Sequence, residues 1–293
     1  MFKNYFKVAL RYLARHKGYT IINVMGLAVG IGCCILIMLF VKSEWSFDRF
    51  HSKADRIHRA WLQEHYEGQV FTNTVTPIPL APVLQNNLPE IETTCRVYSF
   101  EPLVRYNNNI FTEQLNMVDS TFFNMFDFTM KQGDRKNTFP TGNSIVVTEA
   151  SAKKYFGKGP AVGKNIELQL SGEWVPFTVA SVVKDVPLES SIQFDMLISF
   201  ANARRFFSEK GMKQAWSSVS LETYVLLKEG ASATTANAKI AAVMDPIVAK
   251  NYKPGEYKVT LQPLTDIHLD NTLPAGNEPV INPKYSTILA TIG

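Results

Sequence analysis

The chain has 293 residues, of which 46% are hydrophobic and 12% aromatic, so it can form one or two cores and is not generally disordered. Its net charge of +4 is unevenly distributed: residues 1–19 carry five basic and no acidic residues, and residues 20–41 carry no charge. Subtraction leaves about −1 for residues 42–293, which argues against a nucleic-acid-binding protein, because such a domain needs a basic face.

Residues 1–19 predict an amphipathic, basic arm on the cytoplasmic side of a membrane. Its positive charges Lys3, Lys7, Arg11 and Arg15 recur every four residues, and Lys17 is the fifth basic residue of the arm. Aromatic and aliphatic residues fall on an adjoining helical face: Phe2, Tyr5, Phe6, Ala9, Tyr12 and Leu13. This layout is typical of a helix that lies on an anionic membrane surface. The alternative is an ordinary positively charged flank of a membrane helix.

Residues 20–41 predict a transmembrane helix. These 22 uncharged residues would extend about 33 Å as a helix, enough for a hydrocarbon core of roughly 30 Å. A cleaved signal peptide would have a shorter apolar region, and a lipoprotein signal ending at Gly32-Cys33 would not continue apolar to Val41. Since the basic residues precede the span, we expect the N-terminus in the cytoplasm and the main domain in the periplasm of a bacterial inner membrane.

Small residues inside the span give a weak indication of helix packing. Gly26 and Gly30 form a GxxxG pair, and Ala28 with Gly32 repeats the spacing. The alternative is that glycine is simply frequent in membrane helices.

Residues 285–293 predict the start of a second, truncated transmembrane helix, because Pro283 and Lys284 give way to an uncharged aromatic and aliphatic run. The alternative is a short apolar tail packed on the domain. Residues 42–284 would then form the periplasmic domain, with both of its ends at the membrane surface.

Hydrophobic patterning between the spans predicts an α+β domain. Paired strands are expected around turns at 66–69, 107–109 and 171–172. The predicted strands are 57–64, 70–76, 96–106, 110–118, 144–147, 164–170, 175–184, 194–199, 221–227 and 257–263. The predicted helices are 79–87, 149–156, 201–209 and 232–249. The different texture of the last third predicts two subdomains, about 53–92 with 206–270, and an inserted strand-rich part at about 93–205.

No motif in the chain predicts a catalytic, cofactor-binding or metal site. The run from Gly157 to Lys164 has the wrong glycine spacing for a phosphate loop and predicts a turn. His51, His58 and His65 are spaced by seven, but a strand would point His58 and His65 to opposite faces, so they are expected to be solvated or interfacial. We expect Asp185 and Asp195 to end strands or cap turns.

The cysteines predict neither a disulfide framework nor a zinc site. Cys33 and Cys34 lie inside the predicted span, which leaves Cys95 alone in the rest of the chain. Cys95 also has no base nearby in the sequence, so a nucleophilic thiol is not expected.

Several runs, in this order along the chain, resemble the permease subunits of MacB/FtsX-type ABC transporters. They are Met1–Tyr5 with Ala9–Arg11, His16–Tyr19, Phe47–His51 with Ala54–Ile57, Ser144–Glu149 with Lys154–Gly157, Val183–Pro187 and Phe194–Met196. These runs cover nearly the whole chain, and their order is more specific than any single one.

The resemblance implies a porter-like subdomain at 53–92 and 206–270 and an inserted sabre-like subdomain at 93–205. It implies a permease dimer driven by a separate cytoplasmic ABC ATPase, so ATP would bind to that partner and this chain would bind no cofactor. A periplasmic or outer-membrane partner is also implied for some relatives. The chain itself would not be an enzyme.

Two other classes of function stay open from the sequence. One is the periplasmic sensor domain of a membrane receptor, whose second span would lead to a signalling module. The other is a membrane-anchored periplasmic enzyme or assembly factor, which the lack of catalytic residues disfavours. The sequence names neither the transported substrate nor the partner ATPase.

Overall fold

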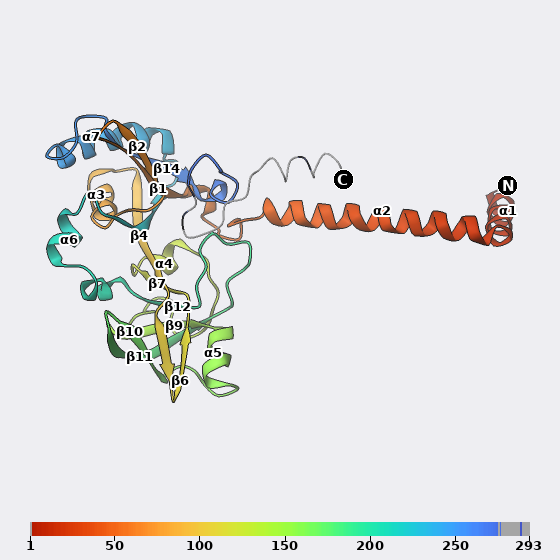
Figure 1. Ribbon diagram of the computed structural model, residues 1–293, viewed down its shortest axis with the longest axis horizontal. Coiled ribbons are helices and arrows are strands. Elements are labelled where there is room, and N and C mark those ends of the chain that lie inside the picture. Colours follow the sequence, from red (N-terminus) through yellow and green to blue (C-terminus); the bar gives the residue numbers. More distant parts are fainter. Residues whose placement is uncertain (1, 275, 277–287, 289–293) are drawn as a thin grey trace. The chain divides into compact units, whose positions relative to one another are not determined.

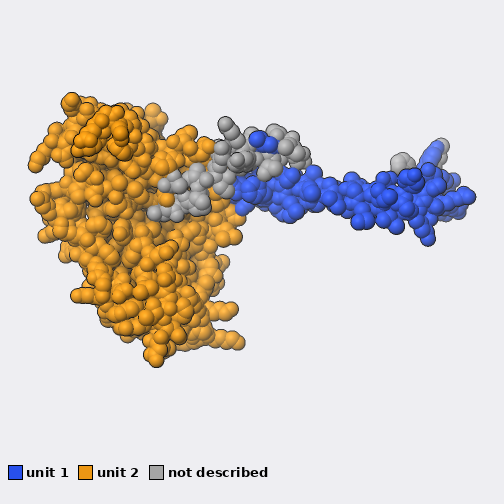
Figure 2. Space-filling model, viewed as in Figure 1, with its two compact units in different colours: residues 1–46, 282–293 blue, residues 47–281 orange. Residues whose placement is uncertain are grey.

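The structure is a computed structural model that describes residues 2–274, 276 and 288. The chain forms two compact units, one centred on residues 1–46 and the other comprising residues 47–281, which Figure 2 colours blue and orange. Of the second span predicted at 285–293, only Ile288 is among the described residues.

The first unit contains helix α1 (Phe2–Arg15) and helix α2 (Lys17–Glu44), drawn in red in Figure 1. The helices break at His16, where the hydroxyl of Thr20 donates hydrogen bonds to the carbonyls of Leu13 and His16, both at 3.0 Å. Helix α2 extends three residues beyond the predicted span at each end. It stops where the amide and hydroxyl of Ser46 both bind the carbonyl of Ser43.

The second unit is built on one 14-stranded sheet, counted over the described residues, and this confirms the predicted α+β class. The strand order is β14-β1-β13-β4-β7-β12-β9-β11-β10-β5-β6, with β2, β3 and β8 off this path. Neighbours are antiparallel except β9 with β11 and β7 with β12. The strands are β1 (Ile57–Tyr66), β2 (Gln69–Asn73), β3 (Thr76–Pro77), β4 (Ile91–Phe100), β5 (Leu103–Tyr106), β6 (Asn109–Thr112), β7 (Leu115–Val118), β8 (Met130–Gln132), β9 (Ser144–Thr148), β10 (Asn165–Leu170), β11 (Glu173–Val183), β12 (Met196–Ser199), β13 (Val219–Leu227) and β14 (Tyr257–Pro263).

Helices α3 (Leu80–Asn87) and α7 (Ala233–Val248) cover the strands at the β14 end of the sheet (Figure 1). In α7 the buried residues recur every four positions, at Ala236, Ile240, Met244 and Val248, which is the spacing of one helix face. They pack with Leu62 and other apolar residues of the sheet in one hydrophobic cluster. This burial, rather than helix propensity, stabilises α7 in its place.

At the β6 end of the sheet, helix α5 (Glu149–Phe156) follows β9 directly. The side chain of Thr148 accepts a hydrogen bond from the amide of Ser151, a standard N-terminal cap, and Gly157 ends the helix with a positive φ of 65°. The predicted strand and helix at 144–156 are therefore confirmed. So is the turn predicted between Gly157 and Lys164, which leads into β10.

The hairpin turns follow from backbone chemistry. Glu67 and Gly68 both have positive φ, as do Ser171 and Gly172, and this left-handed geometry suits tight two-residue hairpins. These positions match the predicted turns at 66–69 and 171–172. The turn predicted at 107–109 is also present, with Asn107 at a φ of 55°.

Three predicted elements were wrong in detail. The strand predicted at 96–106 is interrupted at Glu101-Pro102, since proline has no amide to donate to a sheet. The strand predicted at 110–118 is likewise divided at 113–114, where Glu113 turns to bind the side chains of Lys154 and Tyr155.

The helix predicted at 201–209 is instead a 3₁₀ helix, η2 (Phe200–Arg205), followed by a separate helix, α6 (Glu209–Gln214). Helix α6 begins anew because Ser208 caps it: the Ser208 hydroxyl accepts a hydrogen bond from the amide of Gly211 at 3.1 Å. The division into subdomains at 53–92 with 206–270 and at 93–205 stays a prediction.

Candidate functional site

Helix α2 is the one helix in the described ranges that is long and apolar enough to cross a membrane. Its 28 residues extend about 42 Å, more than a hydrocarbon core of roughly 30 Å. A Cβ atom added at Gly26 or Gly30 would have no atom within 4 Å, so this small-residue face is open to a neighbouring helix. That such a helix packs there remains a prediction.

The basic arm is helical and exposed. Lys3, Lys7, Arg11 and Arg15 lie on α1, and Lys17 is the first residue of α2. The apolar side chains of the same helix are also exposed, with Phe6 at 67% and Tyr12 at 66%. An exposed apolar face beside a basic stripe is what a membrane-surface helix requires, and the lipid contact itself remains a prediction.

The chain segment that follows α2 is built into the folded domain. Trp45 and Ser46 alone separate the end of α2 from Phe47, the first residue of the second unit. Phe47–Lys53 contact residues 124–127, 189–191 and His268, and we call this set of residues the junction. Its location is fixed by the covalent chain: it lies within a few residues of the end of the predicted membrane helix.

Asp48 is the buried carboxylate of the junction, with 0% of its surface exposed. Its amide donates to the carbonyl of Glu189 at 2.9 Å, and its Oδ1 accepts from the amide of Ser191 at 2.9 Å. Its φ of 57° is a left-handed conformation that aspartate tolerates better than most residues. Burial raises the pKa of Asp48 to about 6, opposed by the hydrogen bonds from Ser191 and Ser190 and by the charge of His268.

His51 fixes the junction to the segment around α4 (Phe122–Met125). Its Nδ1 accepts a hydrogen bond from the amide of Asp127 at 2.9 Å, and its ring lies edge-on to Phe126 and Phe128, each at 5.3 Å between centroids. Burial lowers the pKa of His51 to about 4, opposed by the charge of Asp127. The ring is therefore a neutral acceptor at neutral pH.

Two further side chains tie the same segments together. The amide and the hydroxyl of Ser52 both donate to Oδ2 of Asp127 at 2.6 Å, and Nζ of Lys53 donates to the carbonyl of Asn124 at 2.7 Å. Amide and hydroxyl donors on one carboxylate oxygen make a charge-assisted pair, which is stronger than a neutral hydrogen bond. The junction is thus held by several bonds from one short segment.

The far end of the domain sequence returns to the junction. The ring of Phe47 stacks on His268, with 3.4 Å between centroids and 3° between planes. The segment that enters the domain from α2 and the segment that precedes residue 274 are therefore in direct contact. A displacement of one segment would therefore change its contact with the other.

A buried polar array spans β13, β1 and β14. Arg59, which is 1% exposed, lies 3.3 Å from Oε1 of Glu222 and donates to Oε1 of Gln262 at 2.9 Å. The hydroxyl of Tyr224 donates to the other oxygen of Glu222 at 3.1 Å, and Gln262 donates to Asp270 at 2.9 Å. Because each partner would be costly to leave alone in the core, the array fixes the alignment of three strands.

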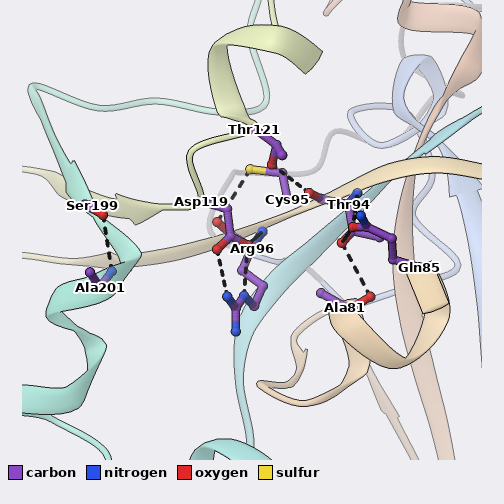
Figure 3. Close-up of polar contacts among 9 residues, drawn as sticks. All are labelled: Ala81, Gln85, Thr94, Cys95, Arg96, Asp119, Thr121, Ser199 and Ala201. Atoms are coloured by element: carbon purple, nitrogen blue, oxygen red, sulfur yellow. Dashed lines mark hydrogen bonds and ion pairs between the residues drawn. The ribbon is translucent and has the colours of Figure 1, made fainter. Parts of the chain in front are cut away.

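A second polar contact joins segments where β4 pairs with β7, on the side of β13 away from β1 (Figure 3). Nε and Nη2 of Arg96 bind both oxygens of Asp119 at 2.9 and 2.7 Å, and the guanidinium lies over the ring of Phe200 at 3.9 Å. Cavities of about 350 and 190 Å³ flank the pair, and Ser120 lines both. Since Asp119 already neutralises Arg96, the arrangement joins segments rather than presenting a free charge.

The side chains considered as chemical groups have structural roles. Oδ1 of Asp185 accepts from the amide of Ala150 in the first turn of α5, and Oδ2 of Asp195 accepts from the amide of Gln114, so both cap backbone as expected. Cys95 is buried, and burial raises the pKa of its thiol, which disfavours the reactive thiolate. In the part of the chain that the structure describes, no group of three or more residues is arranged to hold a metal.

The prediction for the histidines was partly wrong. His65 is exposed, but His51 and His58 are buried, at 3% and 5% exposure. His58 is buried because the first half of β1 is covered on both faces, and its Nδ1 lies 3.1 Å from the carbonyl of Arg56. Sequence reasoning therefore missed the burial of Asp48 and His51. Their signal was an acidic residue directly after Phe47 and a histidine directly after Phe50, a few residues beyond the apolar helix α2.

The fold resembles that of a solved domain named as a permease domain. A domain of a protein named as a permease from Porphyromonas gingivalis is 20% identical, with a TM-score of 0.63, and covers 80% of this chain and 98% of its own. The periplasmic region of MacB from Actinobacillus actinomycetemcomitans is 14% identical, with a TM-score of 0.49, and covers 71% of this chain and 89% of its own. The extracellular domain of the ABC-type transporter YknZ from Gram-positive bacteria is 13% identical, with a TM-score of 0.47, and covers 70% and 99%.

None of the curated proteins matches the chain. The model of one family, the MacB-like periplasmic core domain, matches residues 20–243, which include most of α2 and strands β1 to β13. This match spans well over half of the chain. The protein therefore belongs to the family of MacB-like periplasmic core domains of ABC-type permeases.

Proposed function

We propose that this chain acts as a permease subunit in an ABC-type export or mechanotransmission complex of the bacterial inner membrane. The arm and N-terminus lie in the cytoplasm, α2 crosses the membrane, and residues 47–274 lie in the periplasm. ATP binds to and is hydrolysed by a separate cytoplasmic subunit, and the resulting movement of the membrane helices changes the periplasmic domain. The family match and the basic residues before α2 support this proposal.

The junction is the observation that carries the proposal. A domain that only had to be held near a membrane could hang on a flexible linker. Here Asp48, the fourth residue after α2, is fully buried and bonded through both its amide and its carboxylate. A displacement at the end of α2 therefore reaches the folded domain without being absorbed by a mobile segment.

The complete complex would contain two permease subunits, and a periplasmic or outer-membrane partner could receive the movement. Contacts to such partners belong to the proposal and rest on the family alone. The exposed face around Gly26 and Gly30 supports packing against another membrane helix.

Co-purification from the native membrane tests the proposal. The full-length protein, isolated in mild detergent, should bring a stoichiometric ATP-hydrolysing subunit with it. The hydrolysis rate of that subunit should differ between the isolated and the joined forms, because the permease biases its nucleotide-bound state.

The sensor alternative predicts a different outcome. If no ATPase accompanied the protein and the sequence after a second span encoded a kinase or a coiled coil, transport would be the wrong class. The periplasmic domain would then be the ligand-sensing part of a membrane receptor.

A further inference from the structure

A cavity of about 510 Å³ is lined by residues of the β1–β2 hairpin and of the segment after α7. Figure 1 shows β2 and α7 close together at this end of the sheet. The cavity is lined by Glu64, Tyr66, Phe71, Ser217, Asn251 and Tyr252. Three of these six are aromatic, and one is a carboxylate. None of them belongs to the junction or to the Arg59 array.

The strand register brings the carboxylate and the rings together. Glu64 of β1 lies directly opposite Phe71 on β2 and directly opposite Tyr257 on β14. Residues in register on neighbouring strands point to the same face, and Tyr66 follows Glu64 by two positions on that face. Tyr252 reaches in from the segment after α7, and its hydroxyl donates to Oε1 of Glu64 at 2.5 Å.

Glu64 is only 9% exposed, and no lysine, arginine or histidine of the described residues lies within 4.0 Å of its carboxylate. Burial, followed by the hydrogen bond to Glu64, raises the pKa of Tyr252, so its phenol stays a hydrogen-bond donor. Tyr66 and Phe71, by contrast, expose 55% and 45% of their surfaces. A carboxylate with one neutral donor is thus framed by accessible aromatic rings.

The same domain contains a second site with this composition, and there a cation completes it. Glu113 accepts a hydrogen bond from the hydroxyl of Tyr155, as Glu64 does from Tyr252. Nζ of Lys154 donates to Oε1 of Glu113 at 2.5 Å and lies 4.6 Å from the centroid of the Phe111 ring. An ammonium group is therefore the partner that this combination of carboxylate, phenol and ring accommodates in this fold.

We propose that the Glu64 cavity binds an alkylammonium or guanidinium group supplied from outside this chain. The charged group would pair with Glu64, and its aliphatic stem would pack on Tyr66 and Phe71. Lys258, next to Tyr257 in β14, is on the opposite face of the sheet and does not compete for the carboxylate. The proposal is independent of coupling to an ATPase and extends the chain's role to recognition of a cation.

Ligand-observed NMR on the whole chain in detergent micelles tests the binding. The probes are the methylamides of acetyl-lysine and acetyl-arginine, and the neutral control is the methylamide of acetyl-norleucine, which has the same aliphatic stem as lysine. We expect both cationic probes to bind in the millimolar range and the neutral one at least about tenfold more weakly.

Two variants of the cavity make the test specific. Glu64→Gln keeps an acceptor for Tyr252 but removes the charge, and it should weaken the cationic probes about tenfold or more. Phe71→Lys places an ammonium group opposite Glu64 within the chain and should block the probes while leaving Glu64 in place. Glu173→Gln, at the exposed β10–β11 turn, is the matched control and should bind as the wild type does.

The proposal is overturned if the wild type binds none of the cationic probes at millimolar concentration, or binds the neutral analogue equally well. It is also overturned if Glu64→Gln, shown by circular dichroism to be folded, binds them unchanged. A five-residue peptide with a central lysine identifies the source of the group. If the peptide binds more tightly than n-butylamine, the cavity is assigned to a polypeptide side chain. If the two bind equally, it is assigned to a small amine.

Discussion

Strand β1 has two very different ends. At its start, Ile57 follows a junction in which Asp48, His51 and Asp127 are bonded to neighbouring segments of the same domain. Toward its other end, Glu64 and Tyr66 lie seven and nine residues from Ile57, about 23 and 30 Å along the strand. They face a cavity in which the Tyr66 and Phe71 rings are exposed. Between the two ends, the Arg59 array aligns β1 with β13 and β14.

The two ends of β1 therefore suit different functions. Groups whose hydrogen bonds are made internally hold a fixed geometry, which suits transmission of a displacement from α2. Glu64 instead borders a cavity lined by exposed aromatic rings, so a ligand from outside the chain can reach its carboxylate. The following predictions test this contrast, from the middle of the strand to its ends and then to the membrane helix.

The largest effect is expected for Arg59→Ala, in the middle of β1. The change leaves Glu222, which is 2% exposed, as a buried carboxylate without its cation. We expect the free energy of unfolding to fall by about 3–5 kcal/mol, measured by chemical denaturation of the chain in detergent. Lys213→Ala removes one partner of an exposed pair and is the control, with no measurable change expected. An equal loss in both variants would contradict the role of the array.

The junction should reveal two opposing pH dependences. Burial raises the pKa of Asp48 from 3.8 to about 6, so the folded state binds its proton more tightly than the unfolded state does. The contribution of Asp48 to stability therefore falls as the pH rises from about 4 to 6. Burial lowers the pKa of His51 from 6.5 to about 4, so the unfolded state binds its proton more tightly than the folded state does. The contribution of His51 to stability therefore rises as the pH rises from about 4 to 6.5. In the wild type the two largely cancel.

Single substitutions should expose each contribution. Asp48→Asn keeps an acceptor for Ser191 and tolerates the positive φ, and its stability should rise with pH relative to the wild type between pH 4 and 6, by up to about 3 kcal/mol. His51→Asn keeps an acceptor for the amide of Asp127 and should change in the opposite sense. Denaturant unfolding at pH 4, 5, 6 and 7 measures both slopes. Parallel curves for all three proteins would mean that these groups are not buried as described.

At the cavity end, Tyr252→Phe should have a moderate effect. The change removes the hydroxyl that donates to Glu64, and loss of such a bond to a buried carboxylate should lower the free energy of unfolding by about 1–2 kcal/mol. Tyr106→Phe is the control, because the Tyr106 hydroxyl makes no hydrogen bond to the described residues. Thermal unfolding of both variants decides the matter, and identical melting temperatures would show that Glu64 does not depend on Tyr252.

The smallest effect on the chain itself is expected in α2. Because no atom lies within 4 Å of a Cβ added at Gly26 or Gly30, replacing both by alanine should change the stability of this chain by less than about 0.5 kcal/mol. In the full permease the same two alanine substitutions should weaken the association of membrane helices. Energy transfer between labelled copies in lipid would measure this association. Unchanged association in the double variant would remove the predicted packing face.

Much of the fold followed from local sequence patterns. The hairpin turns at Glu67-Gly68 and Ser171-Gly172, the β9–α5 unit and helix α7 all depend on residues close in sequence, and all were predicted. The strand order could not be predicted, since pairings such as β4 with β13 join residues more than 100 positions apart. The break at Glu101-Pro102 was visible as a proline and was given too little weight.

The functional regions were predictable to a smaller extent. A long apolar helix and an exposed basic helix before it appear as composition, so both helices were predicted, and their contacts with a membrane stay a prediction. The burial of Asp48 and His51 depends on segments around residues 127 and 190, which no local pattern connects to residue 48. The Glu64 cavity likewise depends on register between β1, β2 and β14 and on the distant Tyr252.

Amide hydrogen exchange in the full-length complex tests the central claim most directly. The permease, joined to its ATPase in lipid nanodiscs, would be compared without nucleotide and with ATP, in the wild type and in Asp48→Ala. If the junction transmits movement of α2, exchange in residues 47–66 should change on ATP addition in the wild type, and this change should be lost in Asp48→Ala while the ATPase stays bound. Identical exchange of residues 47–66 in both nucleotide states of the wild type would contradict transmission through the junction.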